Sequence, residues 1–244
     1  MSIYENLLKQ KEKKQFVVLI DPDKPSQDEI INITKVSNKA KVDYFFVGGS
    51  LLTNNSLDIC IKLLKDNSDI PVILFPGNTL QISSKADAIL FLSLISGRNA
   101  EMLIGRHVFS APYIKLSNLE VISTAYMLID SGSPSSVSYM SNSAPIPYNK
   151  DDIAACTAMA GEMLGLKIIF MDCGSGSEKT VSPSMISIVK QSTSIPLIIG
   201  GGIKTPETAT ECCKAGADII VVGNAIEKDD SLITSIADAV HNFS

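Results

Sequence analysis

The sequence predicts a (β/α)8 TIM barrel of the phosphate-binding type, an α/β fold, formed as a single domain over residues 1–244. Three observations support this prediction. Eight short apolar runs recur along the chain, segments with helix signals separate them, and glycine-rich turns follow the last two runs. Alternating strands and helices indicate parallel βαβ units, and eight such units favour a closed barrel over an open sheet.

The eight predicted strands are short apolar runs rich in β-branched residues, which is typical of strands buried on both faces of a parallel sheet. In chain order they cover residues 16–20, 43–47, 72–75, 88–92, 126–129, 167–171, 196–199 and 218–222. Helix signals lie between them. Ser26 precedes an amphipathic run, Thr205-Pro206 is a typical helix start, and Gly216 is a typical helix stop. Residues 131–147 are rich in Ser and Pro and are expected to form a loop on the active face.

Composition and charge exclude several classes of protein. The 21 basic and 26 acidic side chains give a net charge of −5, so nothing in the charge favours nucleic-acid binding. No apolar run approaches the roughly 18–20 residues that span a bilayer, and a cytoplasmic location is expected. The five cysteines lack the paired spacing of a metal site, and we interpret them as reduced packing residues.

Glycine-rich turns follow the seventh and eighth strands. In TIM barrels the loops after the strands build the active site, and the last two commonly bind phosphate. Gly200, Gly201 and Gly202 form the first turn, and Gly223-Asn224 forms the second. Glycine allows backbone amides to approach phosphate oxygens closely. The pattern therefore predicts a phosphate group in the ligand, although it does not identify a reaction.

Two carboxylates are candidates for chemistry. Asp21 ends the first strand and begins Asp21-Pro22-Asp23-Lys24, which suits a Mg²⁺ ligand, although it could equally cap the turn. Asp172 ends the sixth strand beside Gly174-Ser175-Gly176 and is a candidate base, with capping again the alternative. His107 and His241 do not lie at strand ends and are interpreted as surface residues.

Taken together, the motifs resemble the geranylgeranylglyceryl phosphate synthase family, which includes the bacterial heptaprenylglyceryl phosphate synthases. The resemblance is closer to the archaeal-type members and runs nearly end to end. It rests on residues 19–24, 47–50, 88–98, 152–165, 174–176, 200–204 and 221–224. One difference is that the family usually has Tyr-Leu-Glu where this chain has Phe170-Met171-Asp172. Phe170 lacks a phenol, and the Asp172 carboxylate reaches about 1.5 Å less far than that of Glu.

The resemblance implies a Mg²⁺-dependent prenyltransferase. The C3 hydroxyl of sn-glycerol 1-phosphate attacks the allylic carbon of a polyprenyl diphosphate, with geranylgeranyl diphosphate as the expected donor, and diphosphate leaves. By resemblance, Asp21 and Ser50 hold Mg²⁺, and an apolar groove takes the prenyl chain. The candidate catalytic residues are Asp172, as the base, and Lys24, which would steady the diphosphate, with a surface role for Lys24 as the equal alternative. The implied glycerol phosphate contacts are Phe170, Met171, Asp172, Cys173, Gly174, Ser175, Gly176, Gly201, Gly202, Gly223 and Asn224.

Other interpretations of the same motifs stay open. A different phosphate-binding barrel enzyme, of the sugar-phosphate or indole-glycerol-phosphate type, would share the glycine turns. A non-catalytic phosphate-binding barrel would share them too. The expected partners are the two substrates and further copies of the chain in a dimer or hexamer, with transient contact to membrane lipid.

Overall fold

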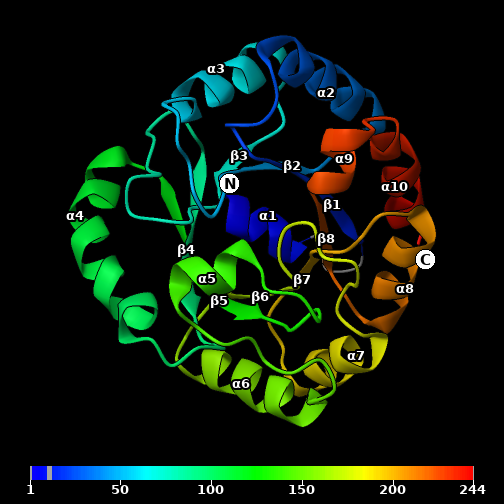
Figure 1. The fold of residues 1–244 in the computed structure, drawn as a ribbon. Coiled ribbons are helices and arrows are strands. Elements are labelled where there is room, and N and C mark those ends of the chain that lie inside the picture. Colours follow the sequence, from blue (N-terminus) through cyan, green and yellow to red (C-terminus); the bar gives the residue numbers. More distant parts are fainter. Residues whose placement is uncertain (1, 10–12, 244) are drawn as a thin grey trace.

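The computed structural model describes residues 2–9 and 13–243, and its strands form one closed barrel in chain order (Figure 1). Neighbouring strands are parallel throughout, and β1 pairs with β8 to close the barrel. The predicted (β/α)8 fold is thus confirmed. The strands are β1 (Gln15–Ile20), β2 (Tyr44–Val47), β3 (Val72–Leu74), β4 (Ala88–Leu94), β5 (Glu120–Leu128), β6 (Ile168–Asp172), β7 (Leu197–Gly200) and β8 (Ile219–Val222).

Helices surround the barrel, and their ends follow the local sequence. Ser26 and Glu29 form a reciprocal capping box at the start of α2, and Gly216 ends α8 in the left-handed conformation. The helices are α1 (Ile3–Lys9), α2 (Gln27–Ala40), α3 (Leu57–Asn67), α4 (Arg106–Ser117), α5 (Ser136–Ser141), α6 (Asp151–Met163), α7 (Pro183–Ser192), α8 (Pro206–Ala215), α9 (Asn224–Lys228) and α10 (Leu232–His241). A π-helical turn, η1 (Glu101–Gly105), leads into α4.

The barrel wall is open on one side, between β3 and β4. β3 has three residues and pairs with β4 at only two positions, Ile73 with Ala88 and Leu74 with Ile89. β4 continues to Leu94 and is paired there only with β5. The described segment 75–87 contains no helix, and Figure 1 shows loops between α3 and α4. The upper part of β4 therefore faces a gap between the strands, and η1 and α4 lie over this gap from outside.

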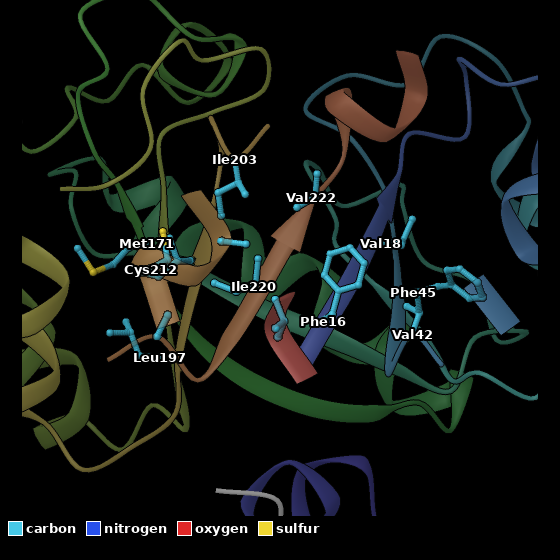
Figure 2. Close-up of a cluster of buried hydrophobic side chains, with 14 of the residues drawn as sticks. Phe16, Val18, Val42, Phe45, Met171, Leu197, Ile203, Cys212, Ile220 and Val222 are labelled. Carbon is cyan, nitrogen blue, oxygen red and sulfur yellow. The ribbon is translucent and has the colours of Figure 1, made fainter. Parts of the chain in front are cut away.

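Alternating strand residues supply two cores. Val17, Phe46 and Phe170 belong to the core inside the barrel, and α1 closes its lower end with Ile3 and Leu7. The other core lies between the strands and the outer helices, and Figure 2 shows part of it, including Phe16, Val18, Ile220 and Val222. Of the five cysteines, all free thiols, Cys156 is exposed and the other four are buried. No helix within the described residues is long and apolar enough to cross a membrane.

Candidate active site

Two neighbouring cavities lie at the carboxyl ends of the strands. The first, here called the mouth pocket, has a volume of about 230 Å³ and lies among the loops after β1, β2, β6, β7 and β8. The second, the apolar groove, has a volume of about 160 Å³ and runs along β4 under α4. Gly49, Ser50, Phe75 and Val137 line both cavities, so the two lie side by side. Val137 belongs to α5, which forms within the segment 131–147 that was expected to be a loop.

Most of the residues predicted from the sequence meet in the mouth pocket. Those lining it are Asp21, Lys24, Ser50, Phe170, Asp172, Gly174, Ser175, Gly176, Gly201, Gly202, Gly223 and Asn224. Met171 and Cys173 do not line it, and their side chains are buried in the outer core instead. Successive residues of a strand point to opposite faces, so a pocket that takes Phe170 and Asp172 cannot also take these two side chains.

Backbone at the glycine turns leaves no room for side chains. Gly201 and Gly202 have φ of 77° and 73°, a region that favours glycine. A Cβ at Gly201 would lie 2.6 Å from Asp172 Oδ1, and one at Gly202 would lie 2.2 Å from the Lys179 carbonyl oxygen. Across the pocket, the Ser175 hydroxyl donates to Asn224 Oδ1 at 2.7 Å. The loops after β6, β7 and β8 thus close around one small polar space.

Asp172 is held by two donors at the end of β6. Tyr126 donates its hydroxyl to Oδ2 at 2.6 Å, and the Gly174 N–H donates to Oδ1 at 2.7 Å. Burial raises the pKa of Asp172 above its ordinary value, against the opposing effect of these two hydrogen bonds. Tyr126 lines the apolar groove while Asp172 lines the mouth pocket, so this pair lies where the two cavities meet.

Asp21 and Lys24 lie on the β1 side of the pocket with Glu227 of α9. Lys24 Nζ is 3.4 Å from Asp21 Oδ2 and 3.0 Å from Glu227 Oε2. A Cβ at Gly49 would lie 3.2 Å from the Asp21 carboxyl, so the glycine leaves space over that carboxylate. No cluster of three or more His, Cys, Asp or Glu side chains suited to a metal occurs among the described residues. Asp21 thus belongs to no such cluster, and it shares the Lys24 ammonium with Glu227.

Asp23 has a structural role in the loop after β2. Its carboxylate accepts hydrogen bonds from the Thr53 and Asn54 N–H groups and from the Ser56 hydroxyl. Burial raises the pKa of Asp23, but these hydrogen bonds outweigh it and the pKa is lowered. Asp23 thus fixes the segment that follows Ser50.

The interpretation of His107 as a surface residue is wrong. Its ring lines the apolar groove and packs edge-on against Phe91, with ring centroids 4.5 Å apart. Its Nε2 lies 2.7 Å from the Leu92 carbonyl oxygen, while Nδ1 is buried with no hydrogen-bond partner in the structure. Leu92 lies beyond the last β3–β4 pair, so the open wall lets a helix residue reach it. His241 pairs with Asp43 at 2.9 Å, with 28% of its side chain exposed, so it is a partly exposed residue.

Sequence reasoning missed three residues of the site: Tyr126, His107 and Glu227. Glu227 had a visible signal, because it follows Gly223-Asn224 by one helical turn. Tyr126 lies within β5 and not at its end, so the residue types at strand ends do not identify it. His107 lies on a helix, and only the gap between β3 and β4 brings it into the groove.

Comparison with known proteins gives consistent similarities over the whole chain. The model of the PcrB family matches residues 8–240. Geranylgeranylglyceryl phosphate synthase of Chitinophaga pinensis is 59% identical over 241 residues, covering 98% of this chain and 96% of that one. The enzyme of the same name from Methanosphaera stadtmanae is 40% identical, covering 97% and 99%.

Solved structures agree. (S)-3-O-geranylgeranylglyceryl phosphate synthase from Thermoplasma acidophilum, in complex with its substrate sn-glycerol-1-phosphate, superposes with a TM-score of 0.94 at 33% identity, covering 99% of both chains. The tryptophan synthase alpha chain of Legionella pneumophila reaches a TM-score of 0.61 at 15% identity, covering 100% of this chain and 99% of that one. That second likeness shows only a shared barrel fold.

Proposed function

The chain belongs to the PcrB family, and from this premise we propose that it is a geranylgeranylglyceryl phosphate synthase, a prenyltransferase that joins sn-glycerol 1-phosphate to a polyprenyl diphosphate. One observation supports this proposal above the others: the mouth pocket, with its glycine turns and carboxylates, lies beside the apolar groove and shares lining residues with it. The reaction requires two adjoining sites of this kind, because it brings a small phosphate ester to the end of a long hydrocarbon chain.

Glycerol phosphate binds in the mouth pocket, with its phosphate among the turns after β7 and β8. Turns of this kind in barrels offer backbone N–H groups to phosphate. Lys204 lies at the rim and adds positive charge. The related enzyme of Thermoplasma acidophilum carries sn-glycerol-1-phosphate. The C3 hydroxyl, at the other end of this short molecule, then reaches Asp172.

The prenyl chain lies in the apolar groove along the open edge of β4. Ile82, Ile89, Leu92 and Ile114 line this groove, and burial of hydrocarbon against such side chains is favourable at about 25 cal/mol per Å². Its diphosphate end points to Ser50 and Gly49, which line both cavities. Geranylgeranyl diphosphate is the proposed donor.

Mg²⁺ is the proposed metal cofactor, held by Asp21 and Ser50. Both offer hard oxygen ligands, and Mg²⁺ commonly uses one or two carboxylates together with water and substrate phosphates. Gly49 places no side chain against the Asp21 carboxylate, which leaves that carboxylate accessible to an ion. When bound, Mg²⁺ stabilises negative charge on the leaving diphosphate. Lys24 supplies a further positive charge at the same edge of the pocket.

Asp172 takes the proton in this reaction. The C3 oxygen forms an ether bond with the allylic carbon of the donor, the bond from that carbon to the diphosphate oxygen breaks, and the diphosphate leaves with the electron pair. The hydroxyl proton passes to the Asp172 carboxylate. The raised pKa of Asp172 makes it a better proton acceptor than an ordinary aspartate. Tyr126 and Gly174 keep the carboxylate oriented.

Further copies of the chain cover the exposed face of α4 and η1 in a proposed homo-oligomer. The exposed side chains of this face include Ile104 at 61%, Phe109 at 71% and Leu116 at 79%. Large exposed apolar side chains gathered on one segment are typical of an interface. Transient contact with membrane lipid belongs to the same proposal, because both the donor and the product carry a long hydrocarbon chain.

An assay with sn-glycerol 1-phosphate, Mg²⁺ and a ladder of farnesyl, geranylgeranyl and heptaprenyl diphosphates tests the function. We expect prenyl transfer, with geranylgeranyl diphosphate as the best donor. Tight binding of glycerol phosphate without turnover on any donor would indicate a non-catalytic barrel. Turnover of sugar or indole-glycerol phosphates in its place would indicate the other class of barrel enzyme.

A further inference from the structure

We infer that Glu227 is a positioning residue that shares the Lys24 ammonium with Asp21, weakens its hold on the Asp21 carboxylate and so leaves that carboxylate better able to bind a divalent cation. The inference rests on the proposed function, because it concerns the cation site of that reaction. It assigns a role to a residue of α9 that follows the phosphate-binding turn and lines the mouth pocket.

Lys24 contacts both carboxylates but lies closer to Glu227. Its Nζ is 3.0 Å from Glu227 Oε2 and 3.3 Å from Oε1, so the ammonium contacts both oxygens of that group. Its distance to Asp21 is longer, 3.4 Å to Oδ2. The other oxygen, Oδ1, accepts the Asp23 N–H at 3.2 Å. The oxygen of Asp21 that Lys24 approaches is thus the one without a closer partner.

Lys24 cannot leave Asp21 by moving its backbone. Its N–H donates to the Asp21 carbonyl oxygen at 3.2 Å, which fixes the turn and keeps the two side chains side by side. An ammonium without another partner would then settle on the Asp21 carboxylate, because opposite charges attract at this range. A bound ammonium would oppose a divalent cation at the same oxygen. A second carboxylate on the far side of Lys24 shares the ammonium and weakens this opposition.

Glu227 is well placed to be that carboxylate. It belongs to α9, where the N–H groups of Ile226 and Glu227 donate to the Gly223 carbonyl oxygen at 2.8 and 3.1 Å. Its side chain is only 17% exposed, against 43% for Lys24. The partner that is held more firmly therefore sets where the mobile ammonium lies. The Lys24–Glu227 pair also joins the β1 loop to the loop that carries Asn224.

A double-mutant cycle with Mn²⁺ as the probe tests this role. Mn²⁺ accepts the same oxygen ligands as Mg²⁺, and its binding to the protein alone can be followed by electron paramagnetic resonance. Glu227→Gln is expected to weaken Mn²⁺ binding about two- to fivefold, the range for one partly exposed ion pair. Glu227→Asp, which keeps the charge, should recover most of the affinity. Glu211→Gln on α8 removes an equal charge from an exposed position and should change nothing.

Glu227→Gln in a Lys24→Met background distinguishes an effect that acts through Lys24 from a direct effect of Glu227 on the cation. If Glu227 acts through Lys24, Glu227→Gln has no further effect on Mn²⁺ affinity once the ammonium is gone. An equal loss of Mn²⁺ affinity in both backgrounds would mean that Glu227 attracts the cation directly, and it would overturn the inference. No loss of affinity from Glu227→Gln in the otherwise unaltered protein would overturn it as well. Mn²⁺ binding that Asp21→Asn leaves intact would overturn the cation site itself. Failure of the proposed function would appear separately, as absence of prenyl transfer by the unaltered protein.

Discussion

Replacement of Asp172 by Asn removes the proposed base while keeping the shape of the side chain. The amide oxygen can still accept the Gly174 N–H that Asp172 Oδ1 accepts at 2.7 Å. The amide nitrogen then faces the Tyr126 hydroxyl, which can rotate and accept a hydrogen bond instead of donating one. The local network therefore survives the substitution, and only the capacity to take a proton is lost.

We expect Asp172→Asn to lower the turnover rate strongly and to leave the stability of the fold undiminished. General-base assistance contributes about 10²–10⁴-fold, equivalent to roughly 3–5 kcal/mol of barrier. Burial raises the pKa of Asp172 in the folded protein, so its contribution to stability is present at low pH and is lost as pH rises through the folded pKa. At neutral pH the ionised carboxylate is then a cost to folding. A neutral Asn removes that cost, so the melting temperature should hold or rise while turnover falls.

Single-turnover rates across pH measure this directly. The unaltered protein should lose activity on the acid side at a pH above the ordinary pKa of aspartate, since the raised pKa protonates the base earlier. Asp172→Asn should be slow at every pH and lack that acid limb, whereas Asp172→Glu should keep much of the activity. A folded Asp172→Asn protein whose rate falls by less than about threefold would refute the base assignment, because that is far below the range for such groups.

Three further substitutions test the rest of the site. Tyr126→Phe removes a hydrogen bond that lowers the pKa of Asp172, so the acid limb of the pH–rate profile should move to higher pH. An acid limb at the same pH as in the unaltered protein would count against this coupling. Asp21→Ala should abolish turnover while calorimetry still detects glycerol phosphate binding, and unchanged turnover at saturating Mg²⁺ would exclude Asp21 as a needed ligand. Asn224→Ala should weaken glycerol phosphate binding by about 1 kcal/mol, the value of one hydrogen bond, and leave prenyl diphosphate binding unchanged; equal loss of both affinities would point to damage of the fold.

The barrel was predictable because its strands are buried on both faces and read as continuous apolar runs. The start of β5 was not, since the strand begins at Glu120 and not at Tyr126. Its first residues mix polar and apolar side chains without a continuous apolar run, and the Glu120 carboxylate accepts the N–H groups of Ile3 and Tyr4 at the lower end of the barrel. That role depends on a helix distant in sequence, which local pattern cannot reveal.

The residues of the mouth pocket could be predicted from residue types at strand ends, whereas those of the apolar groove could not. Strict alternation along β6 could have excluded Met171 and Cys173, because Phe170 and Asp172 face the pocket. The groove depends on β3 ending early and on the absence of a helix in segment 75–87. Those are properties of the assembled wall, and they bring His107 from the outer ring to the edge of β4.

Mass-spectrometric identification of the product from sn-glycerol 1-phosphate and geranylgeranyl diphosphate tests most directly whether the two cavities work as one site. We predict a single ether product whose mass equals the two substrates minus diphosphate, together with one equivalent of diphosphate, and a much slower reaction with sn-glycerol 3-phosphate. Release of diphosphate without the ether, or no reaction from a folded protein that binds both substrates, would contradict the joining of the mouth pocket and the apolar groove in one reaction.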